Sequence, residues 1–168
     1  VLIGVDRTSG LLEQAQQALA DCGPARFETI LADVTQIGPW LEGADVVLHL
    51  GYQRPPGTAL LMERFEIELT NVRMAQNVYH CAYASGVRRV VVGSSNHAAD
   101  WYEHALIHEG KSDVVRPTDL PLSDNFYGWA KASYELLGFV DAAGRLGRKL
   151  EVVLLRIGAP RDVSGRRY

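Results

Sequence analysis

Short runs of apolar and β-branched residues recur along the chain, and each run ends in a polar or glycine-bearing turn. Such runs predict β-strands, because four to eight consecutive apolar residues between turn signals are typical of strands buried on both faces. The strand-like runs occupy residues 1–5, 27–32, 45–50, 89–92 and 150–157.

Longer segments with apolar positions at helical spacing separate these runs. They predict helices over residues 11–20, 60–84 and 126–144, whereas residues 98–125 are rich in loop formers. Ser85-Gly86 closes the second pattern, and a glycine there is typical of a helix C-terminus. Strands alternating with helices predict an α/β fold with a doubly wound parallel sheet, covered on both faces, in one domain over residues 1–168.

Polar residues gather where the predicted strands end. Asp6, Asp33, Gly51 and Gly158 each follow a strand-like run, and so does the segment 94–97. In open parallel sheets, ligands bind outside the carboxyl ends of the strands. We therefore expect the binding site at this edge of the sheet.

One expected motif is absent from the sequence. A dinucleotide-binding domain normally opens with a strand and a G-x-x-G-x-x-G type of turn that holds the pyrophosphate, and no such turn occurs here. If residues 1–6 form the second strand of that fold, the missing first strand belongs at the centre of the sheet. Its absence would leave two neighbouring strands unpaired. We therefore expect a Rossmann-like sheet without its first strand and glycine-rich turn, in a chain truncated at both ends.

Composition and charge exclude several classes of protein. The chain has 168 residues, 47% of them hydrophobic, and a formal net charge of -3, so no basic surface favours nucleic acid. Its longest apolar runs are far shorter than the ~20 residues of a membrane-spanning helix. Cys22 and Cys81 lie far apart without histidines at ligand spacing, which predicts neither a disulfide framework nor a metal site. No leader-like segment opens the chain, so the cytoplasm is the expected compartment.

Tyr127 and Lys131 lie four residues apart on a predicted helix, which places both side chains on one face. A nearby ammonium stabilises a phenolate, so the pair could take a proton from a hydroxyl. The alternative is an ordinary contact on a helix surface. Gly93-Ser-Ser-Asn-His97 strengthens the catalytic interpretation, because its hydroxyl and amide groups could orient a substrate oxygen. Simple turn chemistry is the alternative for the serines, and a solvated loop residue for His97.

With these motifs in this order, nearly the whole chain resembles the extended short-chain dehydrogenase/reductase family, also called the NAD-dependent epimerase/dehydratase family. The resemblance implies that Tyr127 and Lys131 are catalytic. It places Ser95, rather than Ser94, beside the substrate oxygen. Asn71 matches the family's asparagine, although a helix-surface amide is the alternative.

The same resemblance implies an NAD site along the strand ends. An acidic residue at Asp6 can bind the ribose hydroxyls and repel a 2′-phosphate, which favours NAD over NADP despite the neighbouring Arg7. The other implied cofactor contacts are Asp33, Val34, Leu50, Gly51, Ile157 and Pro160, together with Tyr127 and Lys131. A helix N-cap is the alternative for either aspartate.

Within the family, the chain looks most similar to the uronate dehydrogenases, which oxidise the anomeric hydroxyl of a sugar acid with NAD. Asn96 and His97 would then contact the sugar hydroxyls or carboxylate. The chain departs from that subgroup at Gly51-Tyr-Gln-Arg54, at Asp100 and in a longer stretch 95–127. These departures all lie on the expected substrate side.

Two other functions stay open at this point. An NDP-sugar epimerase or dehydratase would use the same triad but retain its nicotinamide through the cycle. A nucleotide-binding protein without catalysis would keep only the fold. The resemblance also suggests a homodimer through the helices predicted over 60–84 and 126–144.

Overall fold

The computed structural model describes residues 1–20, 23, 26–36 and 41–158. Within them the strands are β1 (Leu2–Asp6), β2 (Phe27–Leu31), β3 (Val46–His49), β4 (Arg89–Ser95) and β5 (Glu151–Ile157). The α-helices are α1 (Ser9–Leu19), α2 (Leu61–Ala84), α3 (Asp100–Tyr102) and α4 (Phe126–Ala142). A 3₁₀ turn at Asn96–Ala99 precedes α3, and a π-helical turn at Glu103–Ile107 follows it. The predicted α/β class is confirmed.

The strands form two separate parallel sheets. β1 pairs with β2, with Leu2 opposite Phe27. β4 is the central strand of the second sheet, where Arg89 lies opposite Val46 of β3 and Glu151 of β5. Because all pairs are parallel, the carboxyl ends of the strands in each sheet point the same way.

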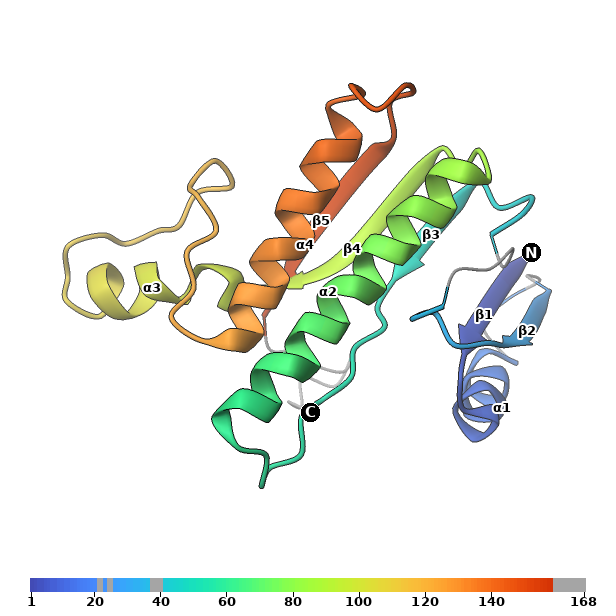
Figure 1. Ribbon diagram of the computed structural model, residues 1–168, viewed down its shortest axis with the longest axis horizontal. Coiled ribbons are helices and arrows are strands. Elements are labelled where there is room, and N and C mark those ends of the chain that lie inside the picture. The colour runs from blue at the N-terminus through green and yellow to red at the C-terminus, as the bar shows by residue number, and fades with distance from the viewer. Residues whose placement is uncertain (21–22, 24–25, 37–40, 159–168) are drawn as a thin grey trace.

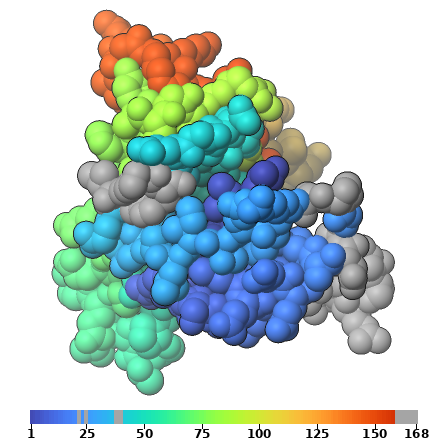
Figure 2. All heavy atoms as spheres, turned by 90° about the vertical axis from the view of Figure 1, so that its right-hand side faces the viewer, coloured from blue at the N-terminus to red at the C-terminus, as the bar shows by residue number. Residues whose placement is uncertain are grey.

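β1 and β3 are neighbours that do not pair (Figure 1). Figure 2 looks at this side of the molecule, with β1, α1 and β2 in blue at the front and β3 in cyan above them. Leu2 of β1 and both Val46 and Leu48 of β3 are exposed. This arrangement agrees with the prediction that two strands lack a partner between them.

Helices α2 and α4 pack side by side on one face of the β3–β4–β5 sheet, and the core lies beneath them (Figure 1). The buried core residues are Ala75, Val78, Tyr79, Ala82, Val87, Val90, Val92, Ala130, Tyr134 and Leu150. On the opposite face of this sheet, Val46, Leu48, Val153 and Leu155 are exposed. In the described residues, helix cover is therefore present on one face of this sheet.

The ends of α2 and α4 follow the local sequence. The Asn125 side chain accepts a hydrogen bond from the Gly128 backbone N–H at 2.9 Å and so caps the first turn of α4. Ser85 ends α2, and Gly86 follows with φ of 74°, a conformation that favours glycine. The predicted boundaries of both helices are confirmed to within two residues.

β4 is longer than its sequence predicts. The expected end was Val92, but the strand continues to Ser95 because Gly93, Ser94 and Ser95 pair with the last residues of β5. Small polar residues can extend a strand when a neighbour supplies the hydrogen bonds. The serine pair therefore lies inside the sheet, so the alternative of simple turn chemistry is wrong for these two residues.

Two further findings concern the helices. Within the described residues, no helix has both the length and the apolar character needed to cross a membrane.

The outer side of α4 exposes Leu136, Phe139 and Val140. A homodimer through α2 and α4 stays a prediction.

Candidate active site

A cavity of about 490 Å³ opens at the carboxyl ends of β3, β4 and β5. Its walls come from those strand ends and from the first turns of α4. The lining residues are Leu50, Tyr52, Gly93, Ser94, Ser95, Asn96, His97, Tyr127, Lys131, Ile157 and Gly158. The cavity thus contains most of the predicted catalytic and substrate-binding residues.

Lys131 is buried at the back of this cavity. Its Nζ donates a hydrogen bond of 2.8 Å to the Gly93 carbonyl, and three aromatic rings surround the ammonium. The distances from Nζ to the ring centroids are 4.7 Å for Tyr134, 5.2 Å for Tyr52 and 5.8 Å for Tyr127. Burial lowers the pKa of Lys131 to about 8, and the charge of Glu68 opposes this shift.

Tyr127 stands between two other rings at the mouth of the cavity. The Tyr52 ring meets it edge-on with centroids 5.2 Å apart, and the His97 ring does so at 5.5 Å. Gly128 follows directly and lets α4 approach the 3₁₀ turn, because a Cβ there would overlap the carbonyl of His97 and the hydroxyl of Ser123. This close approach fixes Tyr127 beside the end of β4.

The two serines of β4 have different partners. Ser94 donates a hydrogen bond of 2.6 Å to Glu135, which also binds Arg156 through two hydrogen bonds of 2.7 and 2.9 Å. Ser95 Oγ accepts a hydrogen bond of 3.2 Å from the His97 backbone N–H. The Ser94 hydroxyl is therefore used to bind α4. The Ser95 hydroxyl donates a long hydrogen bond of 3.4 Å to Oδ1 of Asn96, a bond that a ligand in the cavity could replace.

Asp100 holds His97 in place. Its Oδ2 lies 2.6 Å from Nδ1 of His97 and accepts a hydrogen bond of 2.9 Å from the Asn125 amide. Asp100 is buried, although sequence reasoning treated it only as a departure from a related subgroup. The bond to Nδ1 leaves Nε2 of His97 as the ring nitrogen that can bind a ligand.

Asn71 is fully buried in α2, so the alternative of a helix-surface amide is wrong. Its amide clamps the chain at Gln53, accepting from the Gln53 N–H at 2.8 Å and donating to the Gln53 carbonyl at 2.9 Å. A third bond of 3.1 Å runs to Glu68. Asn71 therefore anchors the loop after β3, and a direct catalytic role for it stays a prediction.

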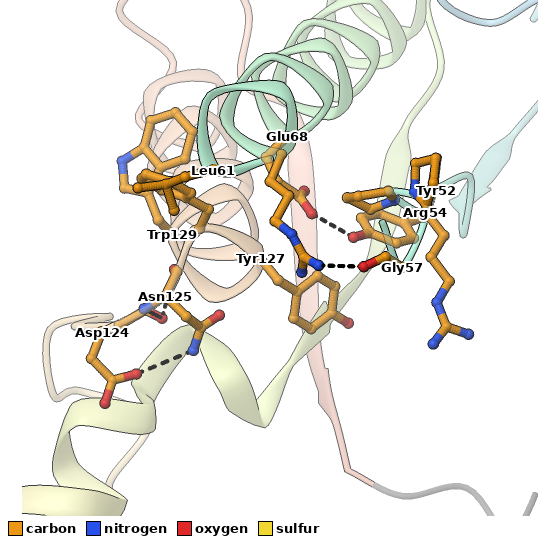
Figure 3. A pocket seen from close by; sticks show the side chains of 14 residues that line it. Tyr52, Arg54, Gly57, Leu61, Glu68, Asp124, Asn125, Tyr127 and Trp129 are labelled. Atoms are coloured by element: carbon orange, nitrogen blue, oxygen red, sulfur yellow. Dashed lines mark hydrogen bonds between the residues drawn. The ribbon is translucent and has the colours of Figure 1, made fainter. Parts of the chain in front are cut away.

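Half-buried Tyr52 and buried Glu68 form a pair that was not predicted from the sequence. The Tyr52 hydroxyl donates a hydrogen bond of 2.5 Å to Glu68, as Figure 3 shows. Burial raises the pKa of both groups, and for Glu68 the bonds from Tyr52 and Asn71 oppose that rise. The sequence indicates only that Glu68 lies near Asn71, because residues three positions apart share one face of a helix. It contains no signal for the bond to Tyr52.

The aspartates predicted to bind adenosine lie at the carboxyl ends of β1 and β2. Asp6 Oδ1 accepts a hydrogen bond of 2.8 Å from the Thr8 N–H, and Thr8 itself is the N-cap residue of α1. Asp33 Oδ1 accepts one of 2.9 Å from the Thr35 N–H, which lowers the pKa of Asp33. The N-cap alternative is therefore wrong for Asp6, and no helix begins within the described residues that follow Asp33, 34–36.

The remaining predicted cofactor residues are placed as follows. Leu50 and Ile157 line the cavity beside Lys131, whereas Gly51 packs toward Met74 and does not line it. Val34 is half-buried in the turn after β2. Pro160 lies outside the described residues. Among the described residues, no group of three or more metal-ligating side chains comes together.

Sequence comparison finds that this chain is similar to proteins named as sugar dehydrogenases. The chain is 32% identical over 124 residues to an L-arabinose 1-dehydrogenase (NAD(P)(+)) of Haloferax volcanii, which covers 70% of this chain and 45% of that protein. It is 28% identical over 131 residues to a uronate dehydrogenase of Pseudomonas syringae, covering 77% of this chain and 42% of that protein. The chain thus spans less than half the length of these relatives. No protein-family model matches it.

The fold has close counterparts among solved structures. A UDP-glucuronic acid 4-epimerase from Bacillus cereus in complex with NAD superposes with a TM-score of 0.68 at 22% identity, over 94% of this chain and 48% of the epimerase. A short-chain dehydrogenase/reductase superfamily protein from Agrobacterium tumefaciens gives a TM-score of 0.57 at 22% identity, over 93% of this chain and 48% of that protein. The Rossmann-like fold is confirmed.

Proposed function

The chain belongs to the extended short-chain dehydrogenase/reductase family, and from this premise we propose that it forms part of an NAD-dependent oxidoreductase acting on a sugar or sugar acid. The observation that carries the proposal is the single cavity into which Ser95, Tyr127 and Lys131 all open. These residue types supply a hydrogen-bond donor, a proton acceptor and a fixed positive charge, as oxidation of a hydroxyl requires.

The strand ends offer groups that fit NAD. Within the described residues, Asp6 uses one carboxylate oxygen for its own turn, and the other can accept a bond from a ribose hydroxyl. Leu50 and Ile157 give the cavity beside Lys131 apolar walls suited to a nicotinamide ring. When bound, NAD supplies the hydride acceptor.

The protein's own residues move the proton. Ser95 donates a hydrogen bond to the substrate oxygen and orients it, and Tyr127 takes the proton from that hydroxyl. Lys131 stabilises the phenolate through its charge, while Gly93 and the surrounding rings fix the ammonium. The substrate carbon loses a hydride and its oxygen loses a proton, so an alcohol becomes a carbonyl, or a hemiacetal a lactone.

The neighbouring His97 extends the substrate side. Its Nδ1 is held by Asp100, so Nε2 contacts a sugar hydroxyl beside the reacting oxygen. Asn96, exposed on the same turn, provides an amide for a second hydroxyl. Both assignments agree with the roles expected from the family resemblance.

A second candidate is an NDP-sugar epimerase or dehydratase. The structural likeness to a UDP-glucuronic acid 4-epimerase favours it, as does a second, larger cavity of about 1040 Å³ that shares Tyr52 and Tyr127 with the first. Such an enzyme would keep its nicotinamide bound and produce no net NADH. A nucleotide-binding protein without catalytic activity would show no turnover, with or without substitution of Tyr127.

The test is formation of NADH, followed by absorbance, when the full-length protein is offered NAD with uronates and with the matching neutral sugars. Formation with any of these sugars supports the dehydrogenase. Binding of NAD without NADH formation, together with conversion of an NDP-sugar, would favour the epimerase or dehydratase instead.

A further inference from the structure

The larger cavity lies on the outer side of Tyr127. Figure 3 shows Tyr52, Arg54 and Gly57 on one side of it and Asp124 and Trp129 on the other, with the Tyr127 ring between them. Pro55, Pro56, Leu61, Phe126 and Trp129 give this cavity a largely apolar wall. Four charged side chains also line it: Arg54, Arg64, Glu68 and Asp124.

Both carboxylates that line this cavity already have partners. Glu68 accepts hydrogen bonds from Tyr52 and Asn71. Asp124 lies 2.6 Å from Nδ1 of His104 and accepts a further bond from its neighbour Asn125. Neither carboxylate forms an ion pair with an arginine of the cavity within the described residues.

Neither arginine of the cavity forms an ion pair with a carboxylate within the described residues. Arg64 donates to two uncharged backbone carbonyls, those of Gly57 at 3.0 Å and Ala59 at 2.9 Å. Arg54 is exposed and has no hydrogen bond or ion pair among the described residues. Arg54 is therefore a charged side chain of this cavity that has no bonding partner among the described residues, and it lines the same cavity as Tyr127.

The loop that carries Arg54 is held at both ends. Asn71 clamps Gln53, the residue directly before Arg54, through both of its backbone groups. Arg64 ties down Gly57 and Ala59 at the other end, and Pro55 and Pro56 restrict the backbone between them. A guanidinium on so constrained a loop loses little further backbone entropy when it binds a ligand.

We propose that Arg54 determines substrate specificity by binding the anionic group of an acidic sugar whose hydroxyl reacts at Tyr127. This inference rests on the proposed dehydrogenase function and names its substrate class. A guanidinium suits a carboxylate or a phosphate because it donates two parallel hydrogen bonds to either group. His97, which lines the smaller cavity, is left to bind a neutral hydroxyl.

The test compares Arg54→Gln with the unchanged full-length protein on glucuronate, glucose 6-phosphate and glucose. The ratio of kcat/KM for an acidic sugar to that for glucose is expected to fall about 10- to 100-fold, the usual effect of losing hydrogen bonds to a charged group. Arg54→Lys should recover part of the ratio, since it restores the charge without the paired donors. Whether glucuronate or glucose 6-phosphate loses more identifies the carboxylate or the phosphate as the ligand group.

Arg26→Gln is the matched control, because it removes one positive charge from an exposed arginine that pairs with Glu28 on β2. It should leave the ratio unchanged. An Arg54→Gln ratio equal to that of the control would overturn the inference, even if NADH still forms.

Direct binding separates this outcome from failure of the proposed function. Ligand-observed NMR with glucuronate and glucose, in the presence of NAD, reports the contact with Arg54 without any turnover. If no sugar is oxidised but Arg54→Gln alone abolishes glucuronate binding, the proposed function fails and the anionic subsite stands. Equal binding of glucuronate by Arg54→Gln and Arg26→Gln would contradict the subsite itself.

Discussion

Glu135 is expected to be a main source of stability at the catalytic end of β4. Its carboxylate on α4 accepts hydrogen bonds from Ser94 of β4 and twice from Arg156 of β5. Glu135 therefore connects α4 to both β4 and β5 next to the cavity. Only 9% of the Glu135 side chain and 22% of the Arg156 side chain are exposed.

Glu135→Ala removes the carboxylate but leaves the Arg156 guanidinium and the Ser94 hydroxyl without a partner. Breaking a buried pair in this way costs about 3–5 kcal/mol, and the partial exposure of Arg156 places the expected loss near the lower end. A loss of about 3 kcal/mol corresponds to a fall in Tm of roughly 6–12 °C for a domain of this size. Glu135→Gln keeps the acceptor for Ser94 and should lose less.

The matched control is Glu151→Ala on β5. Glu151 pairs with Arg88 and Arg89, but the three side chains are 43–57% exposed, so this pair should contribute only about 0–1 kcal/mol. Urea unfolding and thermal melts of the full-length variants measure both effects. Equal losses for Glu135→Ala and Glu151→Ala would refute the reasoning that burial of the pair makes Glu135 important.

Three further predictions follow from the surroundings of the site. Glu68→Gln removes a negative charge that raises the pKa of Lys131. Burial already lowers this pKa to about 8, and we expect the substitution to lower it further. The high-pH limb of the kcat/KM profile should then move to lower pH. A profile that stays in place would contradict this. Gly128→Ala places a methyl group against the backbone carbonyl of His97. We expect the free energy of unfolding, measured with urea, to fall by about 1–3 kcal/mol, and turnover to fall as well. An unchanged free energy of unfolding and unchanged turnover would contradict this prediction. The bond to Asp124 raises the pKa of His104, so NMR titration should find it above its ordinary value and Asp124→Asn should lower it. The pKa of His104 is higher in the folded state than in the unfolded state. The stability that this pair contributes is therefore present below the unfolded-state pKa and is lost as the pH rises through the folded-state pKa. An unchanged His104 pKa in Asp124→Asn would contradict the interaction between the two residues.

Much of the fold follows from local sequence patterns. The continuous apolar runs identified the strands, and helical spacing with Ser85-Gly86 located α2, because these signals act over a few residues. The order of elements also located the strand ends, where Asp6 and Asp33 lie. The extension of β4 through Ser95 could not be predicted in this way, since it depends on pairing with β5.

The details of the site depend on contacts between distant segments. Tyr52 and Glu68 are separated by 16 positions, and Ser94 and Glu135 by 41, so no local pattern indicates either pair. The choice of Ser95 as the substrate serine rested on resemblance alone. The hydrogen bonds give it a physical reason. The Ser94 hydroxyl donates a bond of 2.6 Å to the buried Glu135, whereas the Ser95 hydroxyl donates one of 3.4 Å to the exposed Asn96.

The central claim is that Tyr127 takes the proton from the substrate hydroxyl. The most direct measurement is the rate of NADH formation by full-length Tyr127→Phe, with NAD affinity measured on the same preparation. Loss of a general base typically costs about 10²- to 10⁴-fold in rate, and we expect a loss in that range with NAD binding intact. Undiminished turnover by Tyr127→Phe would contradict the account.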